Sequence, residues 1–291
     1  MLSEPTPAAG PTVVRHRLTP VVYTLAGVEA LAKAVVEAGG DPLPVHLKVD
    51  TGMHRVGCFP EEAAALAELV ASRDELVLEG CCTHFAVADE PDHPSTAGQR
   101  RVFEQVLSAL EETGRRPPVV HAANSAAAVL LPETRYDLVR AGIALYGLPP
   151  APALAGRLPL RPALSLRALV SHVKILEAGS RVSYGLRYEM GRRARVATVP
   201  IGYADGVPRA LAASGGEVLV GGARRPIAGT VTMDQLMVDV GDDPVAVGDE
   251  VVLLGRQGGE EITATEWAER VGTIAYEVVC QIGPRVPRRY R

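Results

Sequence analysis

The segment Val45-His46-Leu47-Lys48-Val49-Asp50 places a run of apolar and β-branched residues directly before Thr51-Gly52. We expect a β-strand in this segment and a turn after it. A segment with helical spacing precedes the strand at Ala26–Ala38, and an alanine-rich one follows it at Pro60–Ser72. A strand between two helices along the chain is the repeating unit of a parallel sheet with crossover helices.

The same alternation continues on both sides of this unit. Val21–Thr24 and Leu76–Phe85 are strand-like, and Ser95–Thr113 has the length and pattern of a helix. Val119–Ser125 and Tyr136–Tyr146 are further apolar stretches, which we interpret as strands. The β-α-β-α order predicts parallel strands in either a barrel or an open sheet.

The pattern changes after Pro149–Pro159, a proline-, alanine- and glycine-rich stretch that we interpret as a linker. Short strand-like segments separated by glycines follow, and they predict an antiparallel β domain. These segments are Ala163–Glu177, Ala194–Ile201, Glu217–Val220, Arg225–Asp239 and Glu250–Leu254. One helix interrupts them, because Thr263-x-x-Glu266 is a capping-box pattern ahead of Trp267–Val271. We therefore divide the chain into domains at 1–158 and 159–291.

Composition excludes several classes of protein. The 291 residues carry 30 basic and 34 acidic side chains, so nothing suggests the basic face of a nucleic-acid binder. No apolar run approaches the ~18 residues of a membrane helix, and the first residues do not form a signal peptide. The four cysteines show no C-x-x-C spacing, so we interpret them as free thiols rather than a metal site. A cytoplasmic protein follows.

Polar or small residues follow each of four successive predicted strands. Taken singly, each has an ordinary structural explanation as a surface charge, a buried histidine or a helix cap. The same position after four strands indicates the carboxyl-terminal mouth of a parallel barrel, where sites are built. The residues are Lys48, Asp50, Arg55, His84, His121, Asn124, Ser125, Arg140 and Gly142.

Eight motifs, in order over nearly the whole chain, resemble those of the alanine racemase family. They are LKVDTGMHRVG (47–57), THFA (83–86), HAANSA (121–126), VRAGIALYG (139–147), VSYG (182–185), PIGYADG (200–206), GTVTMDQ (229–235) and YEV (276–278). The resemblance implies a pyridoxal-phosphate enzyme with a (β/α)8-type barrel and a C-terminal antiparallel β domain.

The resemblance also implies a reaction, the interconversion of L- and D-alanine that supplies D-alanine for cell-wall peptidoglycan. The proton at Cα leaves one face and returns on the other, with pyridoxal phosphate as electron sink. In the family one base is the Schiff-base lysine, and the other is a tyrosine donated by the second subunit. Tyr184 matches that tyrosine, so a homodimer with shared active sites is implied.

Further roles come from the matched positions. Arg140 matches the residue that faces the pyridine nitrogen, and His84 matches a histidine beside the cofactor ring and the catalytic tyrosine. The phosphate region is matched by Asn124, Ser125, Gly142, Ile143 and Tyr276. The substrate contacts are matched by Arg55 and by Met233 of the other subunit, and the entry channel by Asp89, Tyr203 and Arg209. Lys48 matches a lysine that is carbamylated in some members and then orients Arg55; an ordinary strand-end ammonium is the alternative.

The chain departs from the family in three respects. The cofactor lysine of the family lies in a V-x-K-A-[DN]-A-Y-G-type motif, and none of Lys33, Lys48 and Lys174 does. Residues 1–158 fall short of the ~200 of the smallest complete barrels. We therefore expect a barrel that lacks its first strands. Ala275 precedes Tyr276 where the family usually has a polar residue.

These departures leave three hypotheses. The first is an alanine racemase sequence whose N-terminal part is absent. The second is a non-catalytic truncated paralogue that binds a partner protomer or a ligand. The third is an enzyme of the same fold that acts on another amino acid.

Overall fold

The computed structural model describes residues 1–290, and contacts divide the chain into two compact units. Unit 1 comprises Met1–Ala144 and Pro149–Pro159, and unit 2 comprises Leu145–Leu148 and Leu160–Arg291. A four-residue segment thus belongs to the second unit although it precedes the end of the first. The boundary expected after residue 158 stays a prediction.

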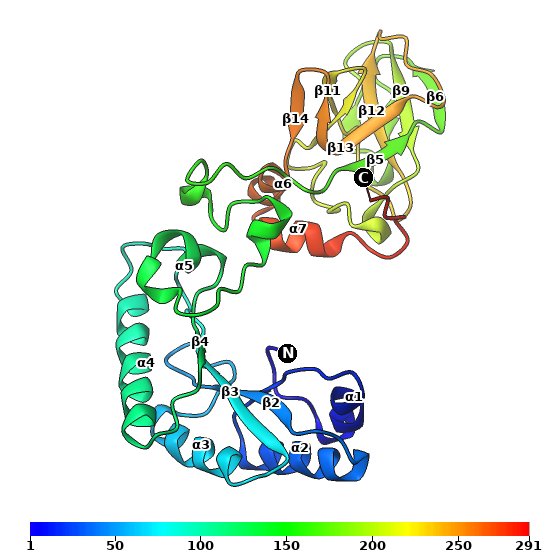
Figure 1. Cartoon of the computed structure of the whole chain (residues 1–291). Coiled ribbons are helices and arrows are strands. Elements are labelled where there is room, and N and C mark those ends of the chain that lie inside the picture. Colours follow the sequence, from blue (N-terminus) through cyan, green and yellow to red (C-terminus); the bar gives the residue numbers. More distant parts are fainter. Residues whose placement is uncertain (291) are drawn as a thin grey trace. The chain divides into compact units, whose positions relative to one another are not determined.

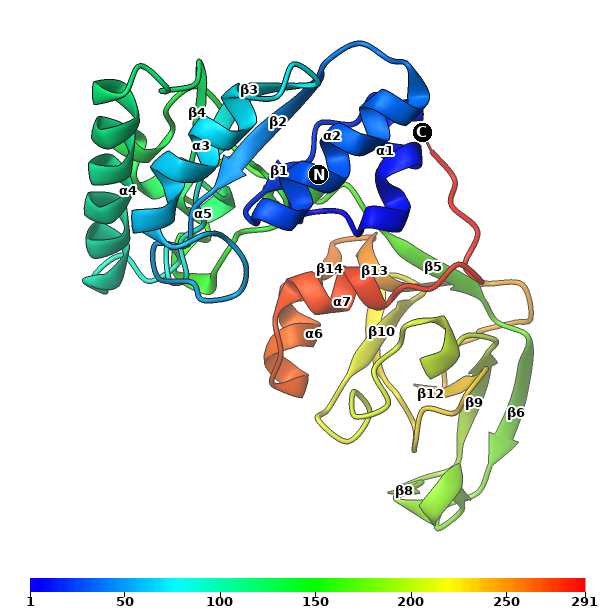
Figure 2. The same ribbon diagram turned by 90° about the horizontal axis from the view of Figure 1, so that it is seen from below.

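Unit 1 is built on a parallel sheet with the strand order β1-β2-β3-β4. The strands are β1 (Val21–Val22), β2 (Leu43–Lys48), β3 (Leu76–Cys82) and β4 (Val119–His121). The helices are α1 (Gly10–Arg15), α2 (Leu25–Ala38), α3 (Ala63–Ala71), α4 (Ser95–Glu112) and α5 (Ser125–Leu130). Figures 1 and 2 show α2, α3 and α4 along one side of this sheet. The expected α/β architecture with parallel strands is confirmed.

The two faces of the sheet differ in chemistry. Along β2, Leu43, Val45 and Leu47 are buried and belong to the core formed with the helices. Because successive side chains in a strand point to opposite faces, His46 and Lys48 lie on the other face. Polar side chains of β2 are thus directed away from the helix-side core.

The ends of α2 follow its sequence. Thr24 accepts a hydrogen bond from the Gly27 N–H at 2.9 Å, which caps the amino end of the helix. Gly39 takes a left-handed conformation with φ of 60° and ends the helix. Both signals are visible in the sequence, and the predicted helix differs from the observed one by a single residue.

One predicted strand is wrong. Within residues 1–290 the structure has no strand at 136–146; Ile143–Tyr146 forms a 3-10 turn instead. The segment runs beside β4, where the N–H groups of Asp137 and Arg140 donate to Val120 and Ala123. The Val120 N–H, however, donates to the side chain of Asp137 at 2.8 Å. This replaces the backbone pairing that a ladder would need.

Unit 2 is the expected antiparallel β domain. Its sheets have the orders β11-β10-β13-β14, with β5 also paired to β13, then β12-β9-β6, and β7-β8. The strands are β5 (Leu166–Leu169), β6 (His172–Leu176), β7 (Arg181–Val182), β8 (Tyr188–Glu189), β9 (Ala194–Val199), β10 (Glu217–Val220), β11 (Ala223–Pro226), β12 (Leu236–Gly241), β13 (Glu250–Gln257) and β14 (Glu260–Ile262).

Two helices complete unit 2, where the sequence predicted one. The expected helix is α6 (Ala264–Val271), capped by Thr263 and ended by Gly272. The missed helix is α7 (Ala275–Gln281), in which no side chain caps the amino end.

Short 3-10 turns occur in both units. They lie at Pro7–Ala9, Pro60–Glu62, Pro132–Thr134, Pro152–Leu154, Tyr184–Leu186 and Tyr203–Asp205.

Two long segments expected as single strands are each divided. Residues 163–177 contain β5 and β6, and residues 225–239 contain the end of β11 and most of β12. Gly229 has φ of 82° in the loop between β11 and β12, a conformation that a strand does not use. That loop carries one of the matched motifs.

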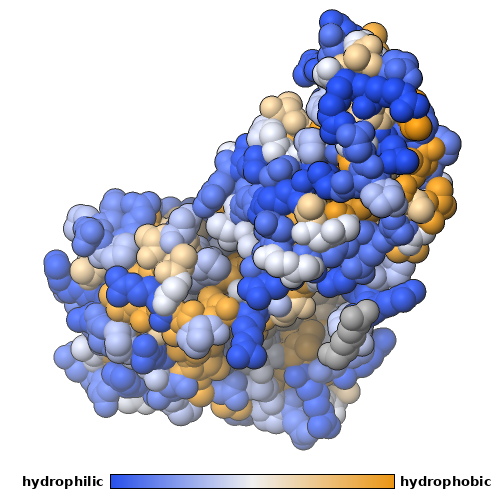
Figure 3. Space-filling model, turned by 90° about the horizontal axis from the view of Figure 1, so that it is seen from above, coloured by the Kyte–Doolittle hydropathy of each residue, from blue (hydrophilic) through white to orange (hydrophobic). Residues whose placement is uncertain are grey.

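Apolar side chains also reach the surface, as the orange atoms on both units in Figure 3 show. Leu145, Tyr184 and Leu186 are among the large exposed ones. In the described part of the chain, no helix combines the length and the apolar character needed to cross a bilayer.

Candidate active site

Arg140 is the hub of the polar groups in unit 1. Its Nη2 donates to the Thr83 carbonyl at 2.7 Å and to the Ala122 carbonyl at 2.9 Å. It also lies 3.1 Å from Nδ1 of His84, and Nη1 lies 2.6 Å from Nδ1 of His121. The carboxyl ends of β3 and β4 therefore hold one guanidinium in place, although Arg140 itself follows no strand.

The two imidazoles beside Arg140 are neutral near pH 7. Burial, and then the Arg140 charge, lower the pKa of His84 to about 4. The same two causes, in the same order, lower the pKa of His121 to about 3. Because a guanidinium has no acceptor, His121 offers Nη1 an unprotonated Nδ1 and carries its own hydrogen on Nε2.

Lys48 lies at the end of β2 and is only 6% exposed. Its Nζ donates to the Leu2 carbonyl at 3.4 Å. Burial lowers the pKa of this ammonium, and the charges of Arg55 and Arg140 act in the same direction. The structure thus brings three predicted residues, Lys48, Arg55 and Arg140, close enough to influence one another.

Arg55 is exposed in the turn that follows β2. The Asp50 carboxylate accepts from the Gly52 and His54 N–H groups, each at 3.0 Å, and so closes this turn. Gly57 has φ of 134°, and a Cβ there would lie 2.6 Å from the Asp50 nitrogen. The tight return of the chain at Gly57 fixes where Arg55 leaves the backbone.

A second polar group lies around the start of α5. Asn124 accepts from the Ala127 N–H at 3.0 Å and caps the helix. The Ser125 hydroxyl accepts from the Gly142 N–H at 2.9 Å, so its own hydrogen remains for another acceptor. A Cβ on Gly142 would meet no heavy atom within 4 Å, which leaves open space beside this turn. Ile143 is buried under it.

Tyr184 of unit 2 lies in a constrained loop. Its side chain is 73% exposed, while its carbonyl accepts from the Thr230 hydroxyl at 2.8 Å. Ser183 donates to the Thr230 carbonyl at 2.6 Å and has φ of 64°, an uncommon conformation for a residue with a side chain. The loop backbone is therefore fixed, while the phenol projects from it.

Met233 and Tyr203 lie side by side in unit 2. The N–H of Tyr203 donates to Thr232, and the N–H of Ala204 donates to Met233, both at 3.0 Å. A Cβ on Gly202 would come within 2.4 Å of the Met233 carbonyl oxygen, so only glycine allows this approach. Met233 is 52% exposed.

Three further predicted residues lie on other turns and on α7. Asp89 is exposed in a turn after β3, and Arg209 is exposed after the Tyr203 turn. Tyr276 is partly exposed on α7. Within residues 1–290, no hydrogen bond joins Asp89 or Arg209 to the other matched residues.

Several buried polar residues received no role in the sequence analysis, although Thr51 and Thr83 lie inside matched motifs. Thr83 bonds to Thr51 at 2.7 Å and to the Val49 carbonyl at 2.9 Å. Gln99 of α4 donates to the His84 carbonyl at 3.0 Å and accepts from the Ala86 N–H at 2.9 Å. These bonds fix the loop that carries His84. His121 was singled out by its position after a strand, but no role was assigned to it.

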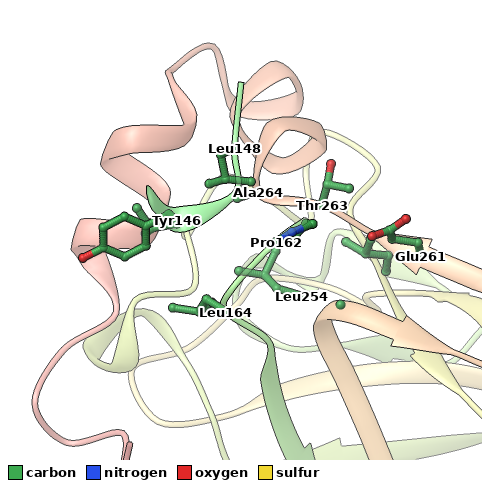
Figure 4. A pocket seen from close by; sticks show the side chains of 11 residues that line it. Tyr146, Leu148, Pro162, Leu164, Leu254, Glu261, Thr263 and Ala264 are labelled. Atoms are coloured by element: carbon green, nitrogen blue, oxygen red, sulfur yellow. The ribbon is translucent and has the colours of Figure 1, made fainter. Parts of the chain in front are cut away.

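One small pocket of unit 2 is too small for a cofactor. Figure 4 shows it between Tyr146, Leu148, Pro162, Leu164 and Leu254. Its volume of about 20 Å³ is that of roughly one water. Within residues 1–290, no group of three or more His, Cys, Asp or Glu side chains is arranged to hold a metal ion.

Comparisons with known proteins agree with this arrangement. The family model "Alanine racemase, N-terminal domain" matches residues 1–150, and "Alanine racemase, C-terminal domain" matches residues 163–290. The alanine racemase of Symbiobacterium thermophilum is 55% identical over 247 residues, which are 84% of this chain and 65% of that protein. The chain thus spans about two-thirds of the length of this curated relative.

Solved structures give the same result. The alanine racemase of D-cycloserine-producing Streptomyces lavendulae matches with a TM-score of 0.92 and 43% identity, over 98% of this chain and 76% of that one. A histidine racemase from Leuconostoc mesenteroides matches with a TM-score of 0.89 and 32% identity, over 100% of this chain and 77% of that one. With family models over both halves, and with the partly buried Arg140 and the exposed Tyr184 loop in the matched motifs, the chain belongs to the alanine racemase family.

Proposed function

We propose that this chain is part of a pyridoxal-phosphate-dependent racemase that interconverts L- and D-alanine. The observation that carries the proposal is the Arg140 guanidinium, held at the carboxyl ends of β3 and β4 by two neutral histidines and two carbonyls. The 55% identity to an alanine racemase supports alanine as the substrate.

The residues present fit the cofactor. Arg140 offers N–H groups and no acceptor, so it suits an unprotonated pyridine nitrogen. The Ser125 hydroxyl retains a hydrogen, and the turn at Gly142 has open space beside it, which together suit a phosphate oxygen. Asn124, Ile143 and Tyr276 would complete the phosphate region. Bound pyridoxal phosphate would supply the electron sink for removal of the Cα proton.

The protein residues would divide the remaining work. Arg140 would hold the ring nitrogen without giving it a proton, which limits electron withdrawal and favours return of the proton over other reactions. His84 would face the ring with a neutral imidazole, because the nearby cation disfavours a second charge. Arg55 would bind the substrate carboxylate, as a guanidinium suits that geometry. Tyr184 would carry the proton on one face of Cα.

We also infer that the site is completed by a second copy of the chain. Tyr184 is 73% exposed on a loop whose backbone is held by hydrogen bonds, so the phenol is presented without being covered. Met233 is likewise exposed on a fixed loop. Such a rigid donor suits a shared active site in a homodimer. Asp89, Tyr203 and Arg209 would line the entry to it.

Two finer features belong to the same proposal. Lys48 would be carbamylated and would then orient Arg55. Three of the four cysteines are buried and all four are free thiols, which suits a reducing compartment such as the cytoplasm. D-Alanine made there would serve the cell wall.

The test uses the complete protein that contains this chain, loaded with pyridoxal phosphate in deuterium oxide. Chiral chromatography should show D-alanine formed from L-alanine, and mass spectrometry should show deuterium at Cα. Tyr184→Phe should lose most of the racemisation, whereas Tyr290→Phe, which alters a tyrosine that is also exposed, should not.

Other outcomes would favour the other hypotheses. Faster racemisation of serine or histidine than of alanine would make the substrate another amino acid, for which the histidine racemase neighbour gives a precedent of fold. If no amino acid exchanges its Cα hydrogen, the chain is a non-catalytic binding protein.

A further inference from the structure

Two histidines from different strands meet across β3. Nδ1 of His46 on β2 lies 2.7 Å from Nε2 of His121 on β4, with ring centroids 5.0 Å apart. Neighbouring strands are separated by ~4.8 Å, so a side chain on the middle strand normally keeps such rings apart. Here the residue of β3 paired with His46 is Gly80, and a Cβ on it would lie 2.6 Å from His46 Nδ1. The missing side chain lets the rings touch.

Glu79 joins this pair because β3 is irregular at that residue. The register passes from Val45↔Leu78 to His46↔Gly80, so Glu79 is the extra residue of a β-bulge. Its Oε2 lies 3.0 Å from His46 Nε2. The Glu79 side chain is 42% exposed, whereas His121 is 3% exposed. A continuous line of hydrogen bonds thus leads from a solvent-accessible carboxylate to the partly buried Arg140.

Only one arrangement of hydrogens satisfies this line. Arg140 can only donate, so Nδ1 of His121 accepts, and a neutral His121 carries its hydrogen on Nε2. That hydrogen points at Nδ1 of His46, which must accept in turn. His46 therefore carries its hydrogen on Nε2 and donates it to the Glu79 carboxylate. The lowered pKa of His121, to about 3, agrees with a neutral ring at this place.

We propose that Glu79 is a positioning residue for Arg140, acting through His46 and His121 to fix the tautomer that presents the His121 Nδ1 lone pair to the guanidinium. Its meaning for catalysis rests on the proposed function, because Arg140 is there the group that faces the cofactor ring. The line of hydrogen bonds itself lies wholly within unit 1.

Loss of the Glu79 carboxylate would remove the reason for His46 to carry its hydrogen on Nε2. A His46 without Glu79 can place its hydrogen on Nδ1, where it would oppose the Nε2–H of His121. Two donors would then face each other, and His121 would have to change tautomer or turn away. Either change withdraws the acceptor from Arg140 Nη1.

Tautomers can be measured directly in the purified chain. With 15N-labelled histidine, long-range 1H–15N spectra at pH 7 should show both His46 and His121 with hydrogen on Nε2. In Glu79→Ala the preference of His46 should fall by about tenfold, as expected for loss of a hydrogen bond to a charged acceptor. The Arg140 Nη hydrogens should then exchange faster with water.

Three matched variants separate a specific effect from a general one. Glu79→Gln keeps an acceptor oxygen without the charge and should retain the Nε2–H tautomers. Gly80→Ala leaves Glu79 in place but displaces the His46 ring, so the line is broken and the Arg140 Nη hydrogens should exchange faster with water, as in Glu79→Ala. Glu75→Gln removes the same charge just before β3 and should change neither ring. Circular dichroism and thermal unfolding check that each variant is folded, and Gly80→Ala tests the same line if Glu79→Ala does not fold.

Hydrogen on Nδ1 of His121 in the unchanged chain would overturn the proposal. So would Glu79→Ala, or Gly80→Ala in its place, with both rings and the Arg140 exchange unaltered. None of these measurements uses cofactor or alanine, so they can succeed even if racemisation is never found. In a racemase-active protein, Glu79→Ala should also lower kcat while changing the KM for alanine much less.

Discussion

At the scale of single residues, the site depends on which groups are charged. Arg140 is the fixed cation, and it shares its surroundings with two imidazoles, one lysine and Arg55. Burial alone disfavours charge on His84, His121 and Lys48, and the guanidinium reinforces this effect. The neutral state of the two histidines and the lowered pKa of Lys48 are therefore set by their surroundings, and both have measurable consequences.

The first consequence is a loss of stability in acid. The unfolded chain binds protons at its histidines near pH 6.5, but folding lowers the pKa of His84 to about 4 and of His121 to about 3. The unfolded state thus binds more protons over this range, and the free energy of unfolding should fall as pH falls from about 6.5 toward 4. Each histidine lowers the free energy of unfolding by at most about 1.4 kcal/mol for each unit by which the pH falls.

Urea unfolding at pH 7, 6 and 5 measures this slope. In His121→Gln the free energy of unfolding should fall less steeply with decreasing pH than in the unchanged chain. His16→Gln, which removes an exposed histidine, serves as control. Equal slopes in all three proteins would mean that His121 is protonated in the folded chain, contrary to its surroundings.

Lys48 gives a second residue-scale prediction. Only a neutral amine adds to carbon dioxide; the nitrogen bonds to the carbon and releases its proton to water. Because burial lowers the pKa of Lys48, this lysine should form a carbamate more readily than exposed Lys33. With 13C-bicarbonate, NMR should show a carbamate signal that disappears in Lys48→Arg and persists in Lys33→Arg. A signal that survives Lys48→Arg would assign the carbamate elsewhere.

The sequence predicted part of this chemistry. His84 and Arg140 were identified from motifs, and both prove to be bonded to each other. Glu79 and His46 were not, because their meeting depends on a bulge and on Gly80 in the neighbouring strand. Register of this kind arises from pairing between distant segments, and a local pattern does not record it.

At the scale of elements, agreement was best where signals are local. The strand at Glu217–Val220 has the predicted bounds, and α6 has the predicted cap and stop. The strand predicted at 136–146 does not form, because the Asp137 side chain takes the place of a backbone hydrogen-bond partner of β4. Helix α7 was missed because no side chain caps it and its Tyr-Glu-Val-Val run favours a strand equally well.

Loop geometry at the element scale gives a third prediction. Gly202→Ala would place a Cβ against the carbonyl oxygens of Thr232 and Met233, which are backbone atoms and cannot simply rotate away. We expect a loss of about 1–3 kcal/mol in the free energy of unfolding, within the range for strained backbone sites. Gly191→Ala, where a Cβ meets nothing within 4 Å, should change it by about 0.5 kcal/mol or less. Thermal unfolding of both variants distinguishes a tight approach from a general cost of alanine.

At the scale of the whole molecule, the proposed shared site gives each chain two roles. It binds cofactor in its own site, and it contributes side chains to the site of the other subunit. Its exposed Tyr184 and Met233 are the groups that the family resemblance assigns to the other subunit's site. Donation needs a dimer in which the loop between β7 and β8 and the loop before β12 keep their hydrogen bonds within unit 2. The donor role can therefore be tested separately from the chain's own cofactor chemistry.

The last prediction uses that separation. A full-length relative, such as the Symbiobacterium thermophilum racemase with its matching tyrosine changed to Phe, should be nearly inactive toward L-alanine. Mixed with this chain, it should recover part of its activity, because its site then receives Tyr184 from a heterodimer. The chain alone measures any background, and the chain with Tyr184→Phe should not rescue. Equal rescue by both versions, or none although mass analysis detects a heterodimer, would show that Tyr184 is not the donated base.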